Sequence, residues 1–392
     1  MPKNFPKNFH EKVAIVGVGY TPPRPITPDV SYKEMIYEAA VKSYNDANLA
    51  SHKDIQGFIT CAEDLIEGTS IFDEYTPDQL GAVQKPMHTI TGDVLHGLAT
   101  AVMNIQTGLM DIVVVEAHSK ASNIKTLPHI INYATDPILN RPLNLHPYYI
   151  AGLEMQNFLS RTKTTLEHCA NVVVKNKRNA LKNDLGCFGA RLTPKEVLES
   201  PPTFSPLTKL QMAEHIDGAI VFVLACQKTA KKLSRKPIWI KGCGWISDSP
   251  TLETRNWKSC DYAKLSAKMA YKEAHIKNPK TQIDFFEVDD TFSYKELEHL
   301  EAIGLYKEGT AGRACAHGDL DPDGKTPVNV SGGSLGIGSL LEASGALRTL
   351  EIIKQLRGEA GPRQLKKANT ALALSWRGIP TTSGATLIFS RK

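Results

Sequence analysis

The sequence lacks the paired cysteines that would indicate a disulfide framework or a zinc ribbon. Its 392 residues hold seven cysteines, an odd number, widely scattered and without a Cys-x-x-Cys pair. Disulfide-rich domains and structural zinc sites both depend on closely spaced cysteines. We therefore expect reduced thiols, no metal site and a cytoplasmic location.

Long apolar runs and a strong charge of one sign are absent as well. The longest apolar runs, 112–115 and 219–226, are far shorter than the ~18 residues of a membrane span. Residues 1–11 contain no apolar run, so we expect no signal peptide. Lys and Arg exceed Asp and Glu by only five charges, too few for the basic footprint of a nucleic-acid-binding protein. We expect neither a membrane span nor a nucleic-acid partner.

What remains is the composition of a folded enzyme-sized protein. Hydrophobic residues make up 42% of the chain and charged residues 22%, a balance typical of globular proteins. A chain of this length exceeds what a single core usually supports, so two or more packed units are expected.

An internal duplication predicts an α/β architecture. Both halves contain a strand, a helix that ends in an Ala-x-x-x-Tyr-x-x-Ala pattern, and a second strand. A glycine-containing turn, a helix and a further strand then follow in each half. In order, these elements are 13–20, 40–49, 55–60, 91–106 and 111–116 in the first half, and 237–243, 267–276, 283–288, 331–355 and 370–375 in the second.

The two halves are separated by a long segment rich in Asn, Pro, Lys and His. It is too long for a plain loop and contains helical stretches near 153–160 and 165–183. We predict an N-terminal half from 1–118 and 216–235, an inserted loop domain at 119–215, and a C-terminal half at 236–392.

Several motifs resemble the thiolase superfamily, in particular its sterol-carrier-type and archaeal branch of acetyl-CoA acetyltransferase-like proteins. The matching segments are 105–108 with 111–115, 176–180, 192–197, 205–207, 217–219, 296–304, 327–333 and 355–364. The resemblance implies the thiolase fold, in which duplicated βαβ halves form five α/β/α/β/α layers and carry an inserted loop domain. It also implies a homodimer or homotetramer, and an acyl-CoA thioester as substrate with no covalently bound cofactor.

The catalytic set that the resemblance implies is replaced in this sequence. Members of the family use a cysteine at the start of a buried helix, because a thiolate there attacks the thioester. Aligning the adjacent motif places Thr91 at this position. Asp289 stands where the family has the histidine of a His-Asp-Cys-Phe motif, and Ser339 where it has the histidine of Gly-His-Pro. Non-standard catalysis, with no nucleophilic cysteine, is therefore expected.

Each candidate residue has a functional and a structural interpretation. Thr91 is either an acylated nucleophile or a helix N-cap. Asp289 is either a general base or a solvated remnant, and because neighbouring strand residues face opposite ways, only one of Asp289 and Asp290 can face a pocket. Tyr294 resembles the tyrosines of sterol side-chain aldolases, where a phenol serves as acid or base; otherwise it is a surface residue at a helix start.

Two glycines and three basic residues also have both a functional and a structural interpretation. Gly333 and Gly338 would let the backbone approach the coenzyme A thioester closely, or would permit tight helix packing. Lys175, Lys177 and Arg178 could meet the phosphates of coenzyme A, although a solvated basic helix face is the favoured interpretation.

Three hypotheses for function follow, of which ordinary thiolase activity is the one that the missing cysteine supports least. The first is an acyl-CoA enzyme that forms or cleaves a carbon–carbon bond, as an acyltransferase or a retro-aldolase, with Thr91, Asp289, Tyr294 and Ser339 at the site. The second is a catalytically inactive subunit that supports an active thiolase-like chain and a small partner with an OB fold and a zinc ribbon.

Overall fold

The computed structural model describes residues 12–50, 52–63, 71–249 and 251–392. The segment on which the signal-peptide expectation rests, 1–11, lies outside the described residues. Within them, no helix combines the length and the apolar character needed to cross a lipid bilayer.

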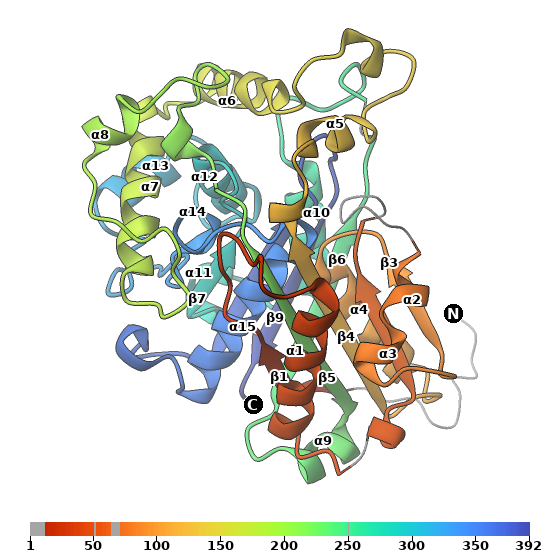
Figure 1. Ribbon diagram of the computed structural model, residues 1–392. Coiled ribbons are helices and arrows are strands. Elements are labelled where there is room, and N and C mark those ends of the chain that lie inside the picture. Colours follow the sequence, from red (N-terminus) through yellow and green to blue (C-terminus); the bar gives the residue numbers. More distant parts are fainter. Residues whose placement is uncertain (1–11, 51, 64–70, 250) are drawn as a thin grey trace.

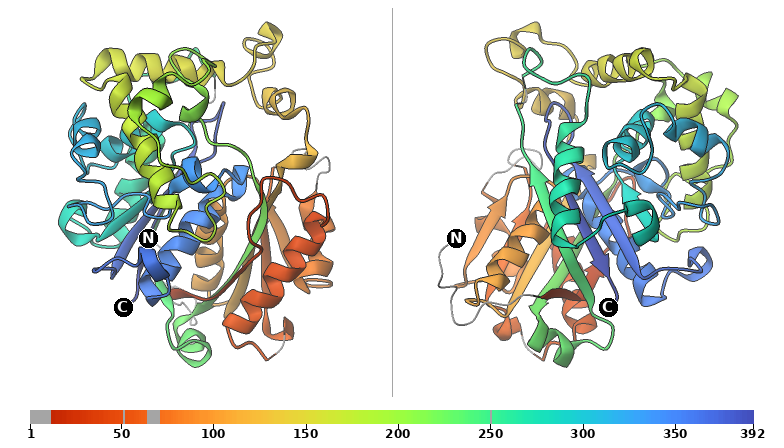
Figure 2. Two further views of the ribbon diagram at one scale, coloured as in Figure 1. Left: turned by 60° about the vertical axis from the view of Figure 1, so that its left-hand side comes forward. Right: turned by 180° about the vertical axis from the view of Figure 1, so that it is seen from behind.

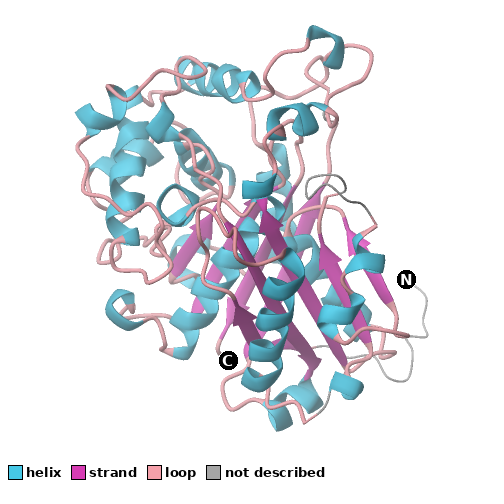
Figure 3. Ribbon diagram, in the orientation of Figure 1, coloured by secondary structure: helices cyan, strands magenta, loops and turns pink. Residues whose placement is uncertain are grey.

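The described strands form one mixed sheet of nine strands in the order β3-β2-β4-β5-β1-β6-β9-β8-β7. Figure 3 shows the strands fanned through the centre of the molecule with helices around them. Their bounds are β1 Val13–Tyr20, β2 Gly57–Cys61, β3 Met87–Ile90, β4 Ile112–Lys120, β5 Asp217–Cys226, β6 Ile238–Ile246, β7 Phe285–Val288, β8 Thr370–Trp376 and β9 Gly384–Ser390.

The sheet confirms the duplication, because the two halves follow the same order outward from their junction. β1 and β6 pair antiparallel at the junction, with Val13 opposite Ile240. Moving outward, β1, β5, β4 and β2 of the first half correspond to β6, β9, β8 and β7 of the second. The pairs β2–β4 and β7–β8 are both parallel.

A matching helix packs on the first strand of each half. α1 (Tyr32–Asp46) lies on β1 and α10 (Asp261–Glu273) lies on β6. A side chain at Gly17 or Gly19 of β1 would collide with the backbone of α1, and one at Gly242 or Gly244 of β6 would collide with the backbone of α10. Only glycine permits this close approach, so the repeated Gly-x-Gly is a packing feature of the duplication.

Two central helices lie between the half-sheets. α4 (Val94–Gln106) and α15 (Ser344–Arg357) share one core cluster with strands of both halves. α1 belongs to the cluster on the outer face of the first half, and α10 and α12 (Ser293–Ala302) belong to the cluster of the second. Packing thus follows the order helix, sheet, helix, sheet, helix (Figure 1).

The helix predicted over 331–355 is interrupted, which corrects that prediction. It consists of α14 (Gly333–Ile337) and α15, separated by an irregular turn. Gly338 at the turn has φ +123°, which ends the helix, and Ser339 then pairs with His215 in an isolated bridge.

The segment between β4 and β5 forms a helical cap, seen along the top of Figure 1 and from two further sides in Figure 2. Its longer helices are α6 (Tyr149–Arg161) and α7 (Leu166–Ala180), and its short ones are α5 (Leu127–Asn132) and α8 (Pro194–Leu198). The remaining short helices of the described chain are α2 (Phe72–Tyr75), α3 (Pro77–Leu80), α9 (Gln227–Leu233), α11 (Pro279–Gln282) and α13 (Ala311–Ala316).

The expectation of a solvated basic face on α7 is wrong for two of its three residues. Lys175 and Lys177 are buried, and only Arg178 is exposed. The Lys175 ammonium lies 3.2 Å from Glu296 and donates to the carbonyl of Val328 at 2.9 Å. Charge patterning along the chain could not reveal this, because the carboxylate that pairs with Lys175 comes from a distant helix.

Asn176 extends this buried contact into a network that attaches the helical cap to the second half. Its amide nitrogen donates to Asp290 and to Glu296, each at 2.7 Å. The side chain of Asn329 also donates to Glu296 at 2.7 Å. Buried carboxylates require such partners, so these contacts fix α7 against α12 and the turn after β7.

Asn176→Ala should therefore lower the free energy of unfolding by about 3 kcal/mol, because it leaves two buried carboxylates short of a donor. The measurement is chemical denaturation of the purified protein. Asn171→Ala on the same helix is the matched control, because among the described residues its amide donates only to the carbonyl of Glu167 one turn earlier. Equal losses in the two variants would show that the network does not anchor the cap.

Candidate functional site

The two central helices begin at one shared carboxylate. Asp93 is the N-cap of α4 and accepts a hydrogen bond from the backbone N–H of Leu95 at 2.9 Å. It also accepts the N–H of Gly345, in the first turn of α15, at 2.8 Å. Thr91 is exposed and lies two residues before the cap, so its interpretation as the N-cap is wrong. Its role as a nucleophile stays a prediction.

A buried arginine lies beside this carboxylate. Arg348 of α15 is 2% exposed and donates to Asp289 at 2.6 Å. It also donates to Ser334 at 3.0 Å and to Ser375 at 3.1 Å. Asp289 is 1% exposed, so the interpretation as a solvated remnant is wrong. The carboxylate instead forms a buried ion pair.

Asp290 points the other way, as the strand alternation predicts. It accepts the backbone N–H groups of Ser334 at 2.6 Å and Leu335 at 3.1 Å. Burial and the nearby Glu296 raise its pKa to about 6. A side chain at Gly333 would collide with this carboxylate, so close packing is one reason for glycine there.

Ser339 is buried in the turn between α14 and α15. Its hydroxyl lies 3.2 Å from that of Ser344 and accepts the N–H of Leu341 at 3.3 Å. A side chain at Gly338 would lie 2.5 Å from Ile216. Both glycines are therefore explained by packing, which is compatible with the predicted approach of a thioester and does not test it.

Tyr294 lies in a separate cluster. It is 0% exposed, and its hydroxyl donates to Glu154 of α6 at 2.8 Å. Burial and the charge of Glu154 raise its pKa. The interpretation as a surface tyrosine is wrong, and among the described residues no hydrogen bond joins Tyr294 to the Arg348 group.

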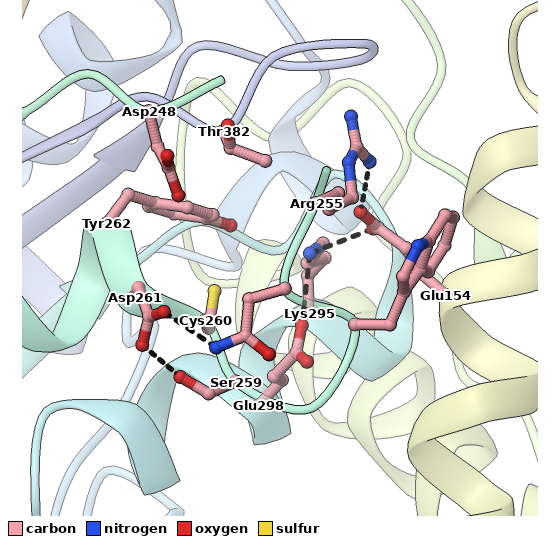
Figure 4. A pocket seen from close by; sticks show the side chains of 12 residues that line it. Glu154, Asp248, Arg255, Ser259, Cys260, Asp261, Tyr262, Lys295, Glu298 and Thr382 are labelled. Atoms are coloured by element: carbon pink, nitrogen blue, oxygen red, sulfur yellow. Dashed lines mark hydrogen bonds and ion pairs between the residues drawn. The ribbon is translucent and has the colours of Figure 1, made fainter. Parts of the chain in front are cut away.

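Figure 4 shows the charged residues around Glu154. Lys295 lies 2.9 Å from Glu154 and 3.0 Å from Glu298, and Arg255 lies 2.7 Å from Glu154. The cavity between them is about 30 Å³, enough for a water molecule or two. These charges satisfy one another, so the cluster fastens α6 to α12 and has no room for an acyl chain.

The cysteine that approaches α4 is a buried thiol. Cys61, at the end of β2, is 0% exposed and lies against Gly97 in α4. Burial and the nearby carboxylate of Glu116 raise its pKa well above the usual value. His96 of α4 is half-buried, and burial lowers its pKa to about 4, so it is neutral at pH 7. Neither side chain provides the thiolate and base of thiol catalysis.

Sequence reasoning missed Arg348 and the role of Asp93. One signal for Arg348 was available, since it lies between Leu347 and Leu350 on a helix whose Leu and Ile residues recur at 347, 350, 353 and 356. A charge in such a setting requires a buried counter-ion. The described residues contain no group of three or more His, Cys, Asp or Glu side chains placed to hold a metal ion. The arrangement can supply hydroxyls, backbone donors and a carboxylate of raised pKa.

Asp93 should make stability fall as the pH rises. Burial raises its pKa from 3.8 to about 6, against the attraction of Arg348. A carboxyl with a raised folded-state pKa stabilises the fold below its unfolded pKa, and this contribution is lost as the pH passes the folded value. Asp93→Asn should therefore gain stability relative to wild type between pH 4 and pH 7, by about 2 kcal/mol.

Urea denaturation at several pH values measures this difference. Asp136→Asn is the control, and its difference from wild type should change with pH in the opposite direction, because backbone N–H donors lower the pKa of that exposed carboxyl. If the difference in free energy of unfolding between Asp93→Asn and wild type stays constant with pH, the raised pKa of Asp93 is contradicted.

A family model matches most of the second half of the chain. Residues 246–391 match the model described as "Thiolase C-terminal domain-like". The acetyl-CoA acetyltransferase of Methanothermobacter thermautotrophicus is 28% identical over 97% of this chain and 99% of that protein. Sterol carrier protein 2 of Oryctolagus cuniculus is 29% identical over 92% of this chain and 69% of that protein.

Solved structures show the same fold. The Ltp2-ChsH2(DUF35) aldolase superposes with a TM-score of 0.83 at 20% identity, covering 98% of this chain and 99% of that chain. Human mitochondrial 3-ketoacyl-CoA thiolase in complex with CoA superposes with a TM-score of 0.72 at 16% identity, covering 97% and 98%. The chain therefore has the thiolase-like α/β fold, and over nearly its whole length its sequence is similar to proteins named acetyl-CoA acetyltransferase and sterol carrier protein 2.

Proposed function

We propose that the protein forms or cleaves a carbon–carbon bond in an acyl-CoA by acid–base chemistry, without a covalent acyl-enzyme. The observation that carries this proposal is the carboxylate of Asp93 at the start of α4. A helix N-terminus stabilises one negative charge, and this is what lowers the pKa of a nucleophilic thiol in cysteine catalysis. Here the carboxylate of Asp93 occupies the N-terminus of α4, two residues after Thr91, and its bond to Gly345 engages the start of α15 as well.

Coenzyme A thioesters are the proposed substrates. In support, a relative is named acetyl-CoA acetyltransferase, and a structure of the same fold was solved with CoA. A thioester carbonyl acidifies its α-carbon and accepts the electrons of a cleaved Cα–Cβ bond, so the reaction needs a proton acceptor and donors to the carbonyl oxygen but no metal or redox cofactor.

Of the two reaction types, acyl transfer and retro-aldol cleavage, retro-aldol cleavage is better supported. Acyl transfer requires a nucleophile, and the residue at that position, Thr91, is an exposed hydroxyl that no base among the described residues contacts through a hydrogen bond. Cleavage of a 3-hydroxyacyl-CoA to an acyl-CoA and an aldehyde or ketone requires none. The superposition on an aldolase with a TM-score of 0.83 agrees with this choice.

The proposed assembly is a homodimer or homotetramer that also binds a small partner protein. β3 lies at the edge of the sheet with half-exposed residues, and an uncovered edge can pair with another chain. The aldolase of similar fold is named after two proteins, Ltp2 and ChsH2(DUF35). By analogy, we expect a partner with an OB fold and a zinc ribbon.

One observation favours the alternative of an inactive supporting subunit. Asp289, which lies at a position expected to be catalytic, and Asp93, at the start of α4, are both engaged in structural contacts. In that case the chain binds its partner and converts no acyl-CoA.

The test is to incubate the protein with acetyl-CoA and with a panel of short, branched and aryl-substituted 3-hydroxyacyl-CoA thioesters. We expect release of a carbonyl product from the panel, no change in intact mass with acetyl-CoA, and a Thr91→Ala variant that keeps its turnover. The carbonyl product is trapped with a hydrazine and identified by mass spectrometry.

Other outcomes separate the alternatives. An acetyl adduct on Thr91 would establish acyl-transfer chemistry and contradict acid–base cleavage. No turnover, no CoA binding and a stoichiometric partner in pull-down experiments would establish the supporting subunit.

A further inference from the structure

A phenol and an imidazole form a hydrogen-bonded pair where the helical cap meets the second half. The hydroxyl of Tyr148, just before α6, lies 3.3 Å from Nε2 of His215, just before β5. Both side chains are half-buried, in contrast to the fully buried Tyr294. Neither residue belongs to the motifs that suggested a site from sequence.

The pair lies between the two turns that replace the family's catalytic motifs. His215 and Ser339 form a parallel bridge, so their side chains project to the same side. At the other turn, the ring of Tyr148 packs edge-on against the ring of Phe292, with the ring centres 5.6 Å apart. Phe292 comes two residues after Asp290. A substrate that lies between the two turns would therefore meet the phenol.

The imidazole has an unusual hydrogen-bonding state. Nδ1 of His215 is buried and has no hydrogen-bond partner among the described residues, whereas nearly all buried polar atoms in proteins have one. Burial lowers the pKa of His215, against the attraction of the exposed Glu214. The ring is therefore neutral at pH 7, and when Nδ1 carries its proton, Nε2 is free to accept the proton of Tyr148.

Tyr148 keeps its proton at neutral pH unless a base takes it. Burial raises the pKa of Tyr148 to about 12. A phenol of this kind can still move a proton if it releases one to a base as it takes one up, because no free phenolate then forms. Within the described part of the chain, His215 is the only base that is hydrogen-bonded to this hydroxyl.

We propose that Tyr148 and His215 form the proton relay of the retro-aldol reaction, with Tyr148 as the catalytic residue that touches the substrate and His215 as its base. This inference rests on the proposed function and names the residues that carry its proton transfer.

The relay balances without a cofactor. The 3-hydroxyl of the substrate gives its proton to the Tyr148 oxygen while Tyr148 gives its own to Nε2 of His215. The Cα–Cβ bond breaks, its electron pair forms the enolate of the thioester, and the aldehyde or ketone leaves. The proton then returns from His215 through Tyr148 to Cα, which yields the shorter acyl-CoA and regenerates both residues.

Tyr148→Phe and His215→Gln test the relay on the full-length protein. Phenylalanine keeps the packing against Phe292, and glutamine keeps a hydrogen-bond acceptor but cannot take up a proton at neutral pH. Each variant should lower kcat for the 3-hydroxyacyl-CoA that wild type cleaves by about 100-fold or more, with KM changed by no more than about threefold.

The double variant distinguishes a relay from two structural roles. Because the two residues act as one unit, the combined variant should lose no more than the larger single loss, whereas independent contributions would multiply. Tyr306→Phe is the matched control and should keep full turnover, because the ring of Tyr306 lies under the ammonium of Lys280 in α11. Thermal melting of every variant confirms that it is folded.

Contradicting outcomes separate this inference from the proposed function. If wild type cleaves a substrate and Tyr148→Phe cleaves it equally well, or if only Tyr294→Phe abolishes turnover, the relay is overturned and the proposed function stands. If wild type cleaves no 3-hydroxyacyl-CoA, both fall.

Discussion

The buried charge of Arg348 is the constraint on which the centre of the molecule depends. A guanidinium with 2% exposure cannot lose its proton, so the fold must bring carboxylates to it. Asp289 supplies one from the end of β7, and Asp93 supplies a second charge nearby from the start of α4. Removing one partner of such a pair typically costs about 3–5 kcal/mol, so this group fixes the relative position of the two central helices and the C-terminal strands.

This arrangement also limits the chemistry that the site can perform. Asp289 is held by the arginine, and Asp93 binds two backbone N–H groups, so neither has the freedom expected of a general base. In the proposed reaction, the groups left to meet a substrate are the phenol–imidazole pair and the hydroxyls near Ser339. Proton transfer through neutral groups agrees with a site whose charges already balance one another.

The strands and their order could be predicted from the sequence, because a strand is determined mainly by residues close to one another in the chain. Apolar runs and repeated glycines fixed β1, β4, β5 and β6, and the order of elements fixed the duplication. The burial of Lys175, the ion pair of Asp289 and the position of Tyr294 could not be predicted, because each depends on a partner far away in the sequence: Glu296, Arg348 and Glu154 are 121, 59 and 140 residues distant. A motif shows which residue stands at a position, and only the fold shows what that residue contacts.

The network around Asn176 connects the stability of the helical cap to the relay. Asn176 holds Asp290, and two residues later Phe292 packs against Tyr148. The carbonyl of Thr291, between them, accepts the N–H of Ala213, two residues before His215. The phenol and the imidazole are thus both positioned by the turn from Asp290 to Phe292. A change that loosens α7 should therefore lengthen the Tyr148–His215 contact, because both residues are positioned by this turn.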